Sequence, residues 1–316
     1  MATQARPVQA PQTDAAATDP DTARPGPWVL LAVGVFLAVV WGTAYTLISV
    51  GVRDLEPVWL VALRTLLGAG LVAAYMYAKD LRFPPLRDRR WLVFGLLGQT
   101  GITIPFILVA IAQTRVPSGL TGILIGVVPI LTVVLAHLVG TERLTRAGFA
   151  GFVLGFFGIV VLFLPEEISL SLVAEWRHQL LLVAASVLYA FTTVSASRAP
   201  PTPSAVGAAI MLVSSAATAL LAAFATGLPS GPITATEWVV IAALGIGSTA
   251  LGTILYVWAA KRGGAGYVAK INYFPPIVSV IAGVAFLRET VDWRFGVAVV
   301  LVLAGMAVSR PRVGSG

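Results

Sequence analysis

Long apolar segments separated by short polar connections dominate this chain. A helix needs about 20 mostly apolar residues, within a range of about 17–25, to cross the hydrocarbon core of a membrane. Ten segments meet this requirement: 28–50, 57–78, 91–113, 117–139, 146–164, 178–197, 204–227, 238–260, 266–287 and 293–309. The pattern therefore predicts an all-α integral membrane protein with ten transmembrane helices.

The two ends of the chain lack such segments. Residues 1–26 are rich in Ala, Pro, Thr and Asp and contain no apolar run of the kind that a cleaved signal peptide needs. We expect them to form a disordered tail, and residues 310–316 to form a second, short tail. The first apolar segment is therefore expected to remain in the protein as a membrane span.

Composition supports the membrane assignment and argues against several other classes of protein. Hydrophobic residues make up 58% of the 316 residues and charged residues only 11%, whereas average soluble domains carry about 25% charged residues. The chain has no cysteine, and its two histidines lie far apart, so we expect no metal, no cofactor and no thiol catalysis. The net charge of +7 comes from basic residues in short connections, so we expect no nucleic-acid partner.

The distribution of lysine and arginine predicts the orientation in the membrane, because cytoplasmic connections carry an excess of these residues. With the N-terminus in the cytoplasm, fourteen of the 21 basic residues fall in cytoplasmic segments and five in outer segments. The other two, Arg64 and Lys270, lie within spans. We therefore expect a multi-pass protein of the cell (inner) membrane with both termini in the cytoplasm.

The chain repeats itself at an offset of 147 residues. The matches extend over about 70 residues without a gap. The pairs are Trp91/Trp238, Gly98/Gly245, Ala112/Ala259, Arg115/Arg262, Gly119/Gly266, Pro129/Pro276, Glu142/Glu289 and Gly158/Gly305. Small residues alone would also fit a common rule of helix packing, but Trp, Pro and Glu in one register indicate a duplication. Duplicated span units are typical of secondary transporters.

The duplication predicts two halves of five spans each, 27–164 and 178–309, joined by the linker 165–177. Because five is an odd number, the second half is inverted in the membrane relative to the first. Glu142 then faces the cytoplasm, and its counterpart Glu289 faces the exterior. Two inverted halves can enclose a central cavity that opens to either side in turn, which is the physical basis of alternating access.

Motifs in the chain resemble those of the EamA-type permeases of the drug/metabolite transporter superfamily. The Trp41-Gly42 pair, followed by Thr-Ala in the first span, looks like the opening Trp-Gly motif of that family. Arg64 stands in the second span, where the family commonly has an arginine. The resemblance covers residues 28–309 and implies ten helices in two inverted five-helix repeats around a central cavity.

The fourth and ninth spans carry the most recognisable feature of this family. Each span runs from small residues through a proline, Pro129 or Pro276, to a glutamate, Glu142 or Glu289. The resemblance therefore implies structural or gating roles for these four residues. For the glutamates, their positions at span ends also fit helix capping or a salt bridge within a connection.

The resemblance implies a secondary transporter that moves a small organic metabolite, with an amino acid or related carboxylate exported by alternating access. A multidrug exporter of lipophilic compounds is the alternative. It is less favoured because a site for lipophilic cations usually needs a carboxylate within a span, whereas all fourteen acids lie in tails, connections or span ends. No enzyme is expected, because the spans contain no paired aspartates, Ser–His pair or metal cluster. The expected partners are the substrate and the lipid bilayer, and a homodimer is compatible with the sequence.

Two cations inside predicted spans, Arg64 and Lys270, are the main candidates for substrate binding. A cation at the centre of the bilayer costs about 2.5–3.5 kcal/mol and needs a partner or water. Because no acid lies deep in a span, a carboxylate of the substrate could supply the missing negative charge. The alternative is that both side chains reach toward the membrane surface, since Arg64 lies in the outer third of its span and Lys270 about one turn inside its own.

The start of the ninth span holds a second group of candidates. Asn272 and Tyr273 precede Pro275 and Pro276, and a proline frees carbonyls of the preceding turn because it lacks an N–H. Freed carbonyls are tolerated at membrane depth only when they are buried in protein or face water. We therefore expect Asn272 and Tyr273 to bind substrate and the prolines to shape the site or its gate; a kink that serves only helix packing is the alternative.

Six further side chains complete the predicted substrate site: Trp41, Tyr45, Gln99, Thr103, Tyr189 and Thr192. Trp41 and Tyr45 are four residues apart and Tyr189 and Thr192 three apart, so each pair lies on one face of a helix. Aromatic rings with a polar tip suit amphipathic ligands. For each of the six, a role in packing or at the membrane interface is the alternative.

Overall fold

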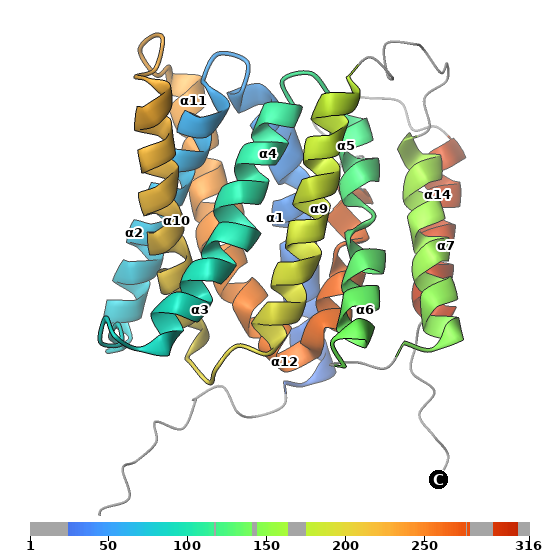
Figure 1. The fold of residues 1–316 in the computed structure, drawn as a ribbon. Helices are drawn as coiled ribbons and strands as arrows, with labels where there is room; N and C mark the ends of the chain where they lie inside the picture. Colours follow the sequence, from blue (N-terminus) through green and yellow to red (C-terminus); the bar gives the residue numbers. More distant parts are fainter. Residues whose placement is uncertain are drawn as a thin grey trace, which may run out of the picture.

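The computed structural model describes residues 25–116, 118–140, 144–163, 175–275, 277–278 and 293–308, and all regular secondary structure within these ranges is helical (Figure 1). The elements in chain order are α1 (Pro27–Gly51), α2 (Pro57–Ala78), α3 (Arg89–Gly98), η1 (Gln99–Thr103), α4 (Ile104–Ala112), α5 (Ser118–Ile125), α6 (Val128–Leu138), α7 (Arg146–Phe163), α9 (Trp176–Ser197), α10 (Ser204–Thr226), α11 (Ala235–Ala243), η2 (Leu244–Leu251), α12 (Gly252–Ile271) and α14 (Trp293–Val308). The segments η1 and η2 are π-helices. The predicted all-α fold is therefore confirmed for the described residues.

Helix starts follow from local sequence. Pro27, Pro57 and Pro129 lie in the first turns of α1, α2 and α6, where a missing backbone N–H has no hydrogen bond to lose. At the start of α11, Thr234 and Glu237 form a reciprocal capping box, which satisfies two backbone N–H groups that the helix leaves unpaired. Pro129 thus has an ordinary role in starting a helix, and its role in gating stays a prediction.

Six helices in the described part of the chain are long and apolar enough to cross a membrane: Pro27–Gly51, Pro57–Ala78, Arg89–Ala112, Trp176–Ser197, Ser204–Thr226 and Ala235–Ile271. They include the first, second, third, sixth and seventh predicted spans. The last of them contains the eighth predicted span and the beginning of the ninth, and it bends at Gly264, whose φ of 76° and ψ of 173° are not helical. A positive φ of this kind favours glycine because other side chains would be strained.

The remaining predicted spans are shorter or divided in the structure. The fourth consists of two helices, α5 and α6, separated by a turn at Gly126 and Val127. The fifth and tenth appear as shorter apolar helices, Arg146–Val161 and Trp293–Gly305. Residues 276 and 279–287 of the ninth lie outside the described residues, and so do Glu142, Pro276 and Glu289.

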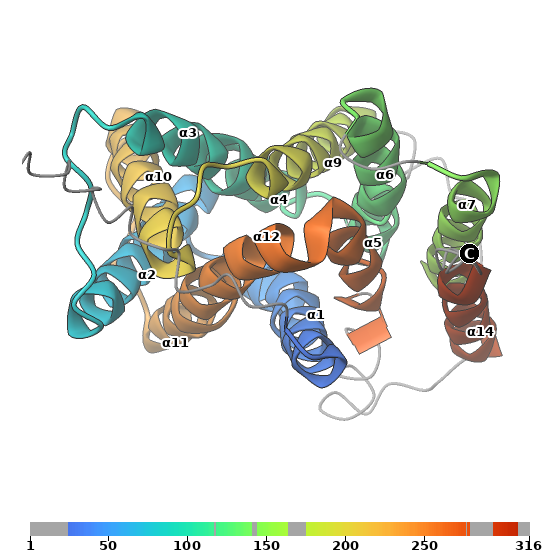
Figure 2. The same ribbon diagram turned by 90° about the horizontal axis from the view of Figure 1, so that it is seen from below.

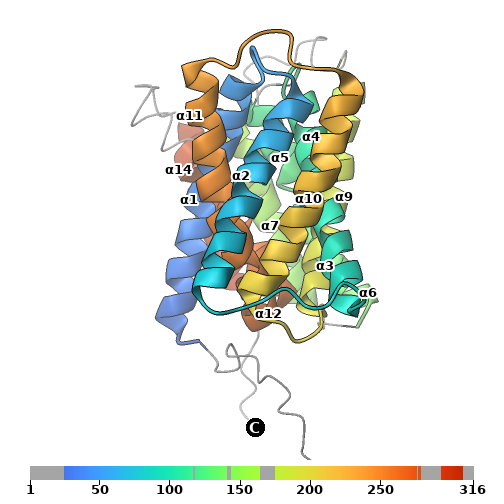
Figure 3. The ribbon, with the colours of Figure 1, turned by 90° about the vertical axis from the view of Figure 1, so that its left-hand side faces the viewer.

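Elements that stand 147 residues apart in the chain pack against each other. Helix α10 begins 147 residues after α2, and the two lie side by side at one end of the bundle (Figures 2 and 3). Helix α14 begins 147 residues after α7, and this pair lies at the opposite end (Figure 2). The helices that surround the centre therefore lie between two such pairs.

The packing between these pairs also follows the offset. The segment α3–η1 packs against α10, and its counterpart α11–η2 packs against α2. Gly98 and Gly245 lie in these two contacts: a methyl group added at Gly98 would overlap the backbone of Met211, and one added at Gly245 would overlap the side chain of Leu67. Both glycines are therefore needed for close approach of helices.

Candidate functional site

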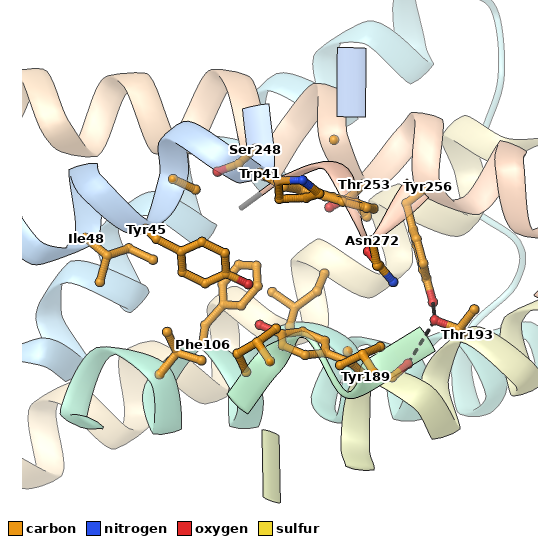
Figure 4. Close-up of a pocket in the computed structure, with 18 of the residues that line it drawn as sticks. Trp41, Tyr45, Ile48, Phe106, Tyr189, Thr193, Ser248, Thr253, Tyr256 and Asn272 are labelled. Atoms are coloured by element: carbon orange, nitrogen blue, oxygen red, sulfur yellow. Dashed lines mark hydrogen bonds between the residues drawn. The ribbon is translucent and has the colours of Figure 1, made fainter. Parts of the chain in front are cut away.

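A cavity lies in the middle of the bundle, with an empty volume of about 1090 Å³ including its opening. Side chains from α1, α2, η1, α4, α5, α6, α9, α10, η2 and α12, and from the turn that follows α12, line it. Elements from both the first and the second half of the chain therefore bound it. Its lining is rich in aromatic rings: Trp41, Tyr45, Phe106, Tyr189 and Tyr256 (Figure 4).

Arg64 is the one charged residue among the described residues of the lining, and its side chain is almost fully buried, with 2% exposed. Its Nε donates a hydrogen bond to the Oγ1 of Thr249 at 3.0 Å, and one terminal nitrogen donates to the Oγ of Ser248 at 2.9 Å. The central carbon of its guanidinium lies 4.2 Å from the centroid of the Phe106 ring. Among the described residues, no carboxylate forms an ion pair with Arg64.

The surroundings hold the guanidinium in place without neutralising it. Hydroxyl groups accept its hydrogen bonds, and the ring of Phe106 offers a cation–π contact. A buried cation without a counter-ion is costly, and its remaining donors suit the planar oxygens of a carboxylate. The chemistry of these donors is therefore compatible with an anionic ligand, and a role of Arg64 in binding one stays a prediction.

Two π-helical segments position the groups around Arg64. Arg64 lies on α2, and α2 packs against η2, which supplies Ser248 and Thr249. The other π-helix, η1, overlaps with η2 when it is shifted by 147 residues, and its Gly101 and Ile102 also line the cavity. Short π-helical segments inside α-helices are frequently found at functional sites, and here both adjoin the same cavity.

Five of the predicted substrate-binding residues line the cavity together: Trp41, Tyr45, Arg64, Tyr189 and Asn272. Pro275, which was predicted to shape the site or its gate, lines it as well. Figure 4 shows the rings of Tyr45 and Tyr189 directed into the same space. Five residues from α1, α2, α9 and the turn after α12 are thus gathered at one place.

Three predicted residues contact neighbouring helices instead. Gln99 donates to Ser214 at 3.4 Å and accepts from Thr218 at 2.8 Å, and both of these partners lie on α10. The Oγ1 of Thr103 lies 3.4 Å from that of Thr218. Thr192, on α9, donates to Thr100 of η1 at 2.8 Å. These side chains connect helices to one another, and a role in substrate binding stays a prediction for each of them.

Three more predicted residues also lie outside the lining. Lys270 lies in the last turn of α12 and is partly buried. The hydroxyl of Tyr273 donates to the backbone oxygen of Phe152 on α7 at 2.5 Å, which directs this side chain away from the cavity. Pro129 is buried in the first turn of α6, next to the lining residue Val128.

Several residues of the site were not predicted from the sequence: Phe106, Ser248, Thr249, Thr253 and Tyr256. Tyr256 donates to the Oγ1 of Thr193 at 3.2 Å, and its ring centroid lies 6.2 Å from that of Trp41 (Figure 4). The 147-residue repeat could have indicated this region as part of the site. The polar cluster around Gln99 falls, after a shift of 147 residues, on the segment that contains Ser248 and Thr249.

The cavity lining itself follows the repeat. Six lining residues of the first half have a counterpart 147 positions later that also lines the cavity. The pairs are Arg64/Met211, Gly101/Ser248, Phe106/Thr253, Val109/Tyr256, Ile125/Asn272 and Val128/Pro275. The two halves therefore contribute equivalent positions to one shared site.

The model of the EamA-like transporter family matches residues 26–164 and 176–310. Among curated relatives, the uncharacterized inner membrane transporter YedA of Escherichia coli (strain K12) is 25% identical over 85% of this chain and 89% of its own length. The aromatic amino acid exporter YddG of Ancylobacter novellus is 26% identical over 88% of this chain and 95% of its own. A probable terminal-alkyne amino-acid exporter of Streptantibioticus cattleyicolor is 27% identical over 89% of this chain and 95% of its own.

A solved crystal structure of another protein has the same fold. It superposes with a TM-score of 0.76 and covers 91% of this chain and 98% of its own, at 23% sequence identity. This likeness concerns the fold alone. The matched relatives and the matched family are transporters and not enzymes.

Proposed function

Because this chain belongs to the EamA-like transporter family, we propose that it is a secondary transporter that exports an amino acid or a related carboxylate by alternating access. It acts in the cell (inner) membrane with both termini in the cytoplasm. The observation that carries the substrate class is Arg64, a buried cation in the central cavity that is held by hydroxyl groups and by an aromatic ring.

The proposed architecture is ten transmembrane helices in two inverted repeats of five. It is supported by the packing of α2 on α10 and of α7 on α14, because elements related by a two-fold axis meet their own counterparts at that axis. The reciprocal contacts of η1 with α10 and of η2 with α2 agree with the same relation. A cavity bounded by both halves can then open to either side when one half tilts against the other.

Names of relatives support the substrate class and the direction of transport. Two of the matched proteins are named as exporters of amino acids, one of aromatic amino acids and one, as probable, of a terminal-alkyne amino acid. A zwitterion fits the cavity of this chain in a simple way. Its carboxylate would bind Arg64, and its ammonium group would lie among the aromatic faces and side-chain oxygens of the lining.

Export of lipophilic cations is less well supported. Such ligands bind most readily near a carboxylate within the membrane, and the described residues that line the cavity include no aspartate or glutamate. The aromatic lining by itself would accept apolar drugs. Neutral lipophilic compounds are therefore useful comparison ligands in the test of the proposal.

The proposal is tested by thermal unfolding of the purified protein in the presence of leucine, leucinamide and a neutral lipophilic dye. A ligand that binds only the folded state stabilises it by about 2.7 kcal/mol at a hundred times its Kd. We expect leucine to raise the melting temperature and leucinamide, which lacks the carboxylate, to raise it much less. Stabilisation by the dye without any effect of carboxylates would contradict the proposed substrate class.

Transport is then measured in vesicles. Protein reconstituted into liposomes loaded with labelled leucine should release the label faster than liposomes without protein. The Arg64→Met variant is the matched control, since it keeps the length of the side chain but removes the charge. Equal release by the variant and the wild type would contradict the proposed role of Arg64.

A further inference from the structure

Four of the six equivalent pairs in the cavity lining differ in polarity in the same sense. On α12, on η2 and in the turn after α12, the second half places four polar side chains in the lining: Ser248, Thr253, Tyr256 and Asn272. The counterparts in the first half are Gly101, Phe106, Val109 and Ile125. In all four pairs, the polar member belongs to the second half.

These residues come from two groups of elements: the polar four from η2, α12 and the turn after α12, and the apolar four from η1, α4 and α5. We name the four from the second half the polar wall and the four from the first half the apolar wall. Figure 4 shows Ser248 and Thr253 of the polar wall on one side of the cavity and Phe106 of the apolar wall across from them. Tyr45 and Tyr189, from α1 and α9, add aromatic rings between the walls.

The polar wall has groups available for a ligand. Ser248 and Tyr256 are already engaged, with Arg64 and Thr193 respectively. The side chains of Thr253 and Asn272 make no hydrogen bond to another described residue, although Thr253 is buried and Asn272 is half-buried. A polar group in such a place is costly unless a ligand or water satisfies it.

Arg64 stands where the two walls meet. Its guanidinium donates to Ser248 of the polar wall and lies over the ring of Phe106 of the apolar wall. Its counterpart in the second half is Met211, which carries no charge. Among the described residues of the lining, Arg64 is therefore the single charged one, and it adjoins both the polar wall and the apolar wall.

We infer that the substrate is an amphipathic amino acid bound in one fixed orientation, with its charged backbone groups on the polar wall and its apolar side chain against Phe106, Val109 and Ile125. This inference rests on the proposed function and adds to it the residues that determine specificity. Thr253 and Asn272 contact the backbone groups of the amino acid, beside the Arg64 site for its carboxylate. Val109 and Ile125 determine which side chains are accepted.

Two reciprocal substitutions of nearly equal volume test this inference, Thr253→Val in the polar wall and Val109→Thr in the apolar wall. The binding of leucine and of serine is measured by isothermal titration, because these two amino acids share their backbone groups and differ only in the side chain. A lost hydrogen bond of about 1 kcal/mol corresponds to an approximately fivefold change in affinity. Thr253→Val should reduce the affinity for both amino acids by about this factor, so the ratio of the two affinities should stay unchanged.

Val109→Thr should act on the side chain instead. A hydroxyl placed against the leucine side chain should reduce the affinity for leucine by about three- to tenfold, while the affinity for serine should change by less than about twofold. The ratio of the two affinities then shifts in this variant alone. A second pair of variants, Asn272→Leu and Ile125→Asn, repeats the comparison, so that a failure of one variant to fold does not decide the result.

The outcomes separate the inference from the proposal on which it rests. If Val109→Thr weakens leucine and serine equally, or if Thr253→Val changes their ratio, the fixed orientation is wrong while amino-acid transport stands. If the folded wild-type protein binds neither amino acid, the proposed substrate class is wrong and the inference falls with it. Melting temperatures without ligand check that each variant is folded.

Discussion

Two junctions in the bundle have the same architecture and opposite chemistry. At one, α2 packs against η2, and Arg64 donates to Ser248 and Thr249. At the other, the counterpart helix α10 packs against η1, and Met211 takes the place of Arg64. Gly101 and Ile102 of η1 stand where η2 has the two hydroxyl-bearing residues.

The difference teaches which features of the repeat serve the fold and which serve the site. Close-packed glycines and the π-helical segments occur in both halves, so they belong to the scaffold. The cation and its hydroxyl partners occur in one half only, so the scaffold does not require them. We therefore propose that the break in symmetry at Arg64 marks a position where function has diverged from packing.

The strongest way to break this comparison is Arg64→Met, which makes the α2 junction resemble the α10 junction. Loss of the charge should weaken the binding of leucine by about 2–5 kcal/mol, or about thirtyfold or more in affinity, because the buried carboxylate of leucine would lose its partner. Stability without ligand should stay equal or increase, since a buried and unneutralised cation is removed. Isothermal titration and thermal unfolding measure the two effects on the same preparation.

Arg64→Lys serves as the control that separates the effect of the charge from the effect of the guanidinium geometry. Lysine keeps the positive charge but lacks the planar donors that match a carboxylate and that reach two hydroxyls together. Binding between that of the wild type and that of Arg64→Met is expected. A large loss of stability in Arg64→Met, without a change in leucine affinity, would show that Arg64 is structural.

The next largest effect concerns the glycines that both junctions share. Gly98→Ala should destabilise the protein by about 1–3 kcal/mol, because the new methyl group meets the backbone of Met211, which cannot move aside. Gly245→Ala should cost less, since the methyl group meets the side chain of Leu67, nearest at its terminal Cδ2, and no backbone. Gly95→Ala is the matched control on the same helix as Gly98: its surroundings leave room for a methyl group, so stability should be unchanged or rise by up to about 1 kcal/mol.

Thermal unfolding of these three variants ranks them directly. Equal stability of Gly98→Ala and Gly95→Ala would mean that the close approach of α3 to α10 does not hold in the membrane. Leucine affinity should change little in any variant that remains folded, because none of the three glycines lines the cavity.

A smaller effect is expected when the hydroxyls that hold Arg64 are removed one at a time. Ser248→Ala and Thr249→Val each delete one acceptor of the guanidinium. Each should reduce leucine affinity by about three- to tenfold, the effect of about 1 kcal/mol, because the guanidinium loses one of the two hydroxyls that orient it. In the background of Arg64→Met, the same substitutions should have almost no effect, and additivity in this double-mutant cycle would contradict their role through Arg64.

The smallest effect is expected from an imposed pH gradient. The described part of the cavity lining contains no aspartate, glutamate or histidine, and such residues are the usual carriers of protons in transporters. A gradient across vesicles should therefore change the rate of leucine transport by less than about twofold. Uphill accumulation driven by the gradient would require a proton carrier elsewhere, and Glu142 and Glu289 would be the first residues to test.

Much of the fold could be predicted from hydrophobicity alone. Spans one, two, three, six and seven stand out because each of their segments supplies an uninterrupted apolar helix. The fourth and eighth spans were less predictable in detail. A turn at Gly126 and Val127 divides the fourth, and the non-helical backbone at Gly264 forms a kink between the eighth and the start of the ninth. Hydrophobicity records burial in the membrane, but it does not record the backbone conformation of individual glycines.

The site was predictable only in part. Trp41, Tyr45, Arg64, Tyr189 and Asn272 stood out because polar or aromatic groups are unusual within apolar helices. A helical position alone does not reveal which neighbour a side chain faces. Gln99 and Thr192, for example, form hydrogen bonds to neighbouring helices instead of lining the cavity.

The partners of Arg64 escaped prediction for a similar reason. Ser248 and Thr249 are small, and they reach the guanidinium because the chain winds as a π-helix at η2. A hydroxyl in an apolar helix commonly bonds to the backbone of its own helix, and Ser248 also donates to Leu244 in this way, at 3.1 Å. Within the spans, only the repeat distinguishes these two residues from other serines and threonines, because it places the polar cluster around Gln99 on their segment.

The most direct test of the account is whether the cavity can be reached from both sides of the membrane. The chain contains no cysteine, so Ile125→Cys, at a lining position, provides a single thiol without any background. In right-side-out and inside-out vesicles, a membrane-impermeant maleimide should label this thiol from either side, and leucine should slow the labelling. Labelling from one side only under all conditions, with no protection by leucine, would contradict alternating access around this cavity.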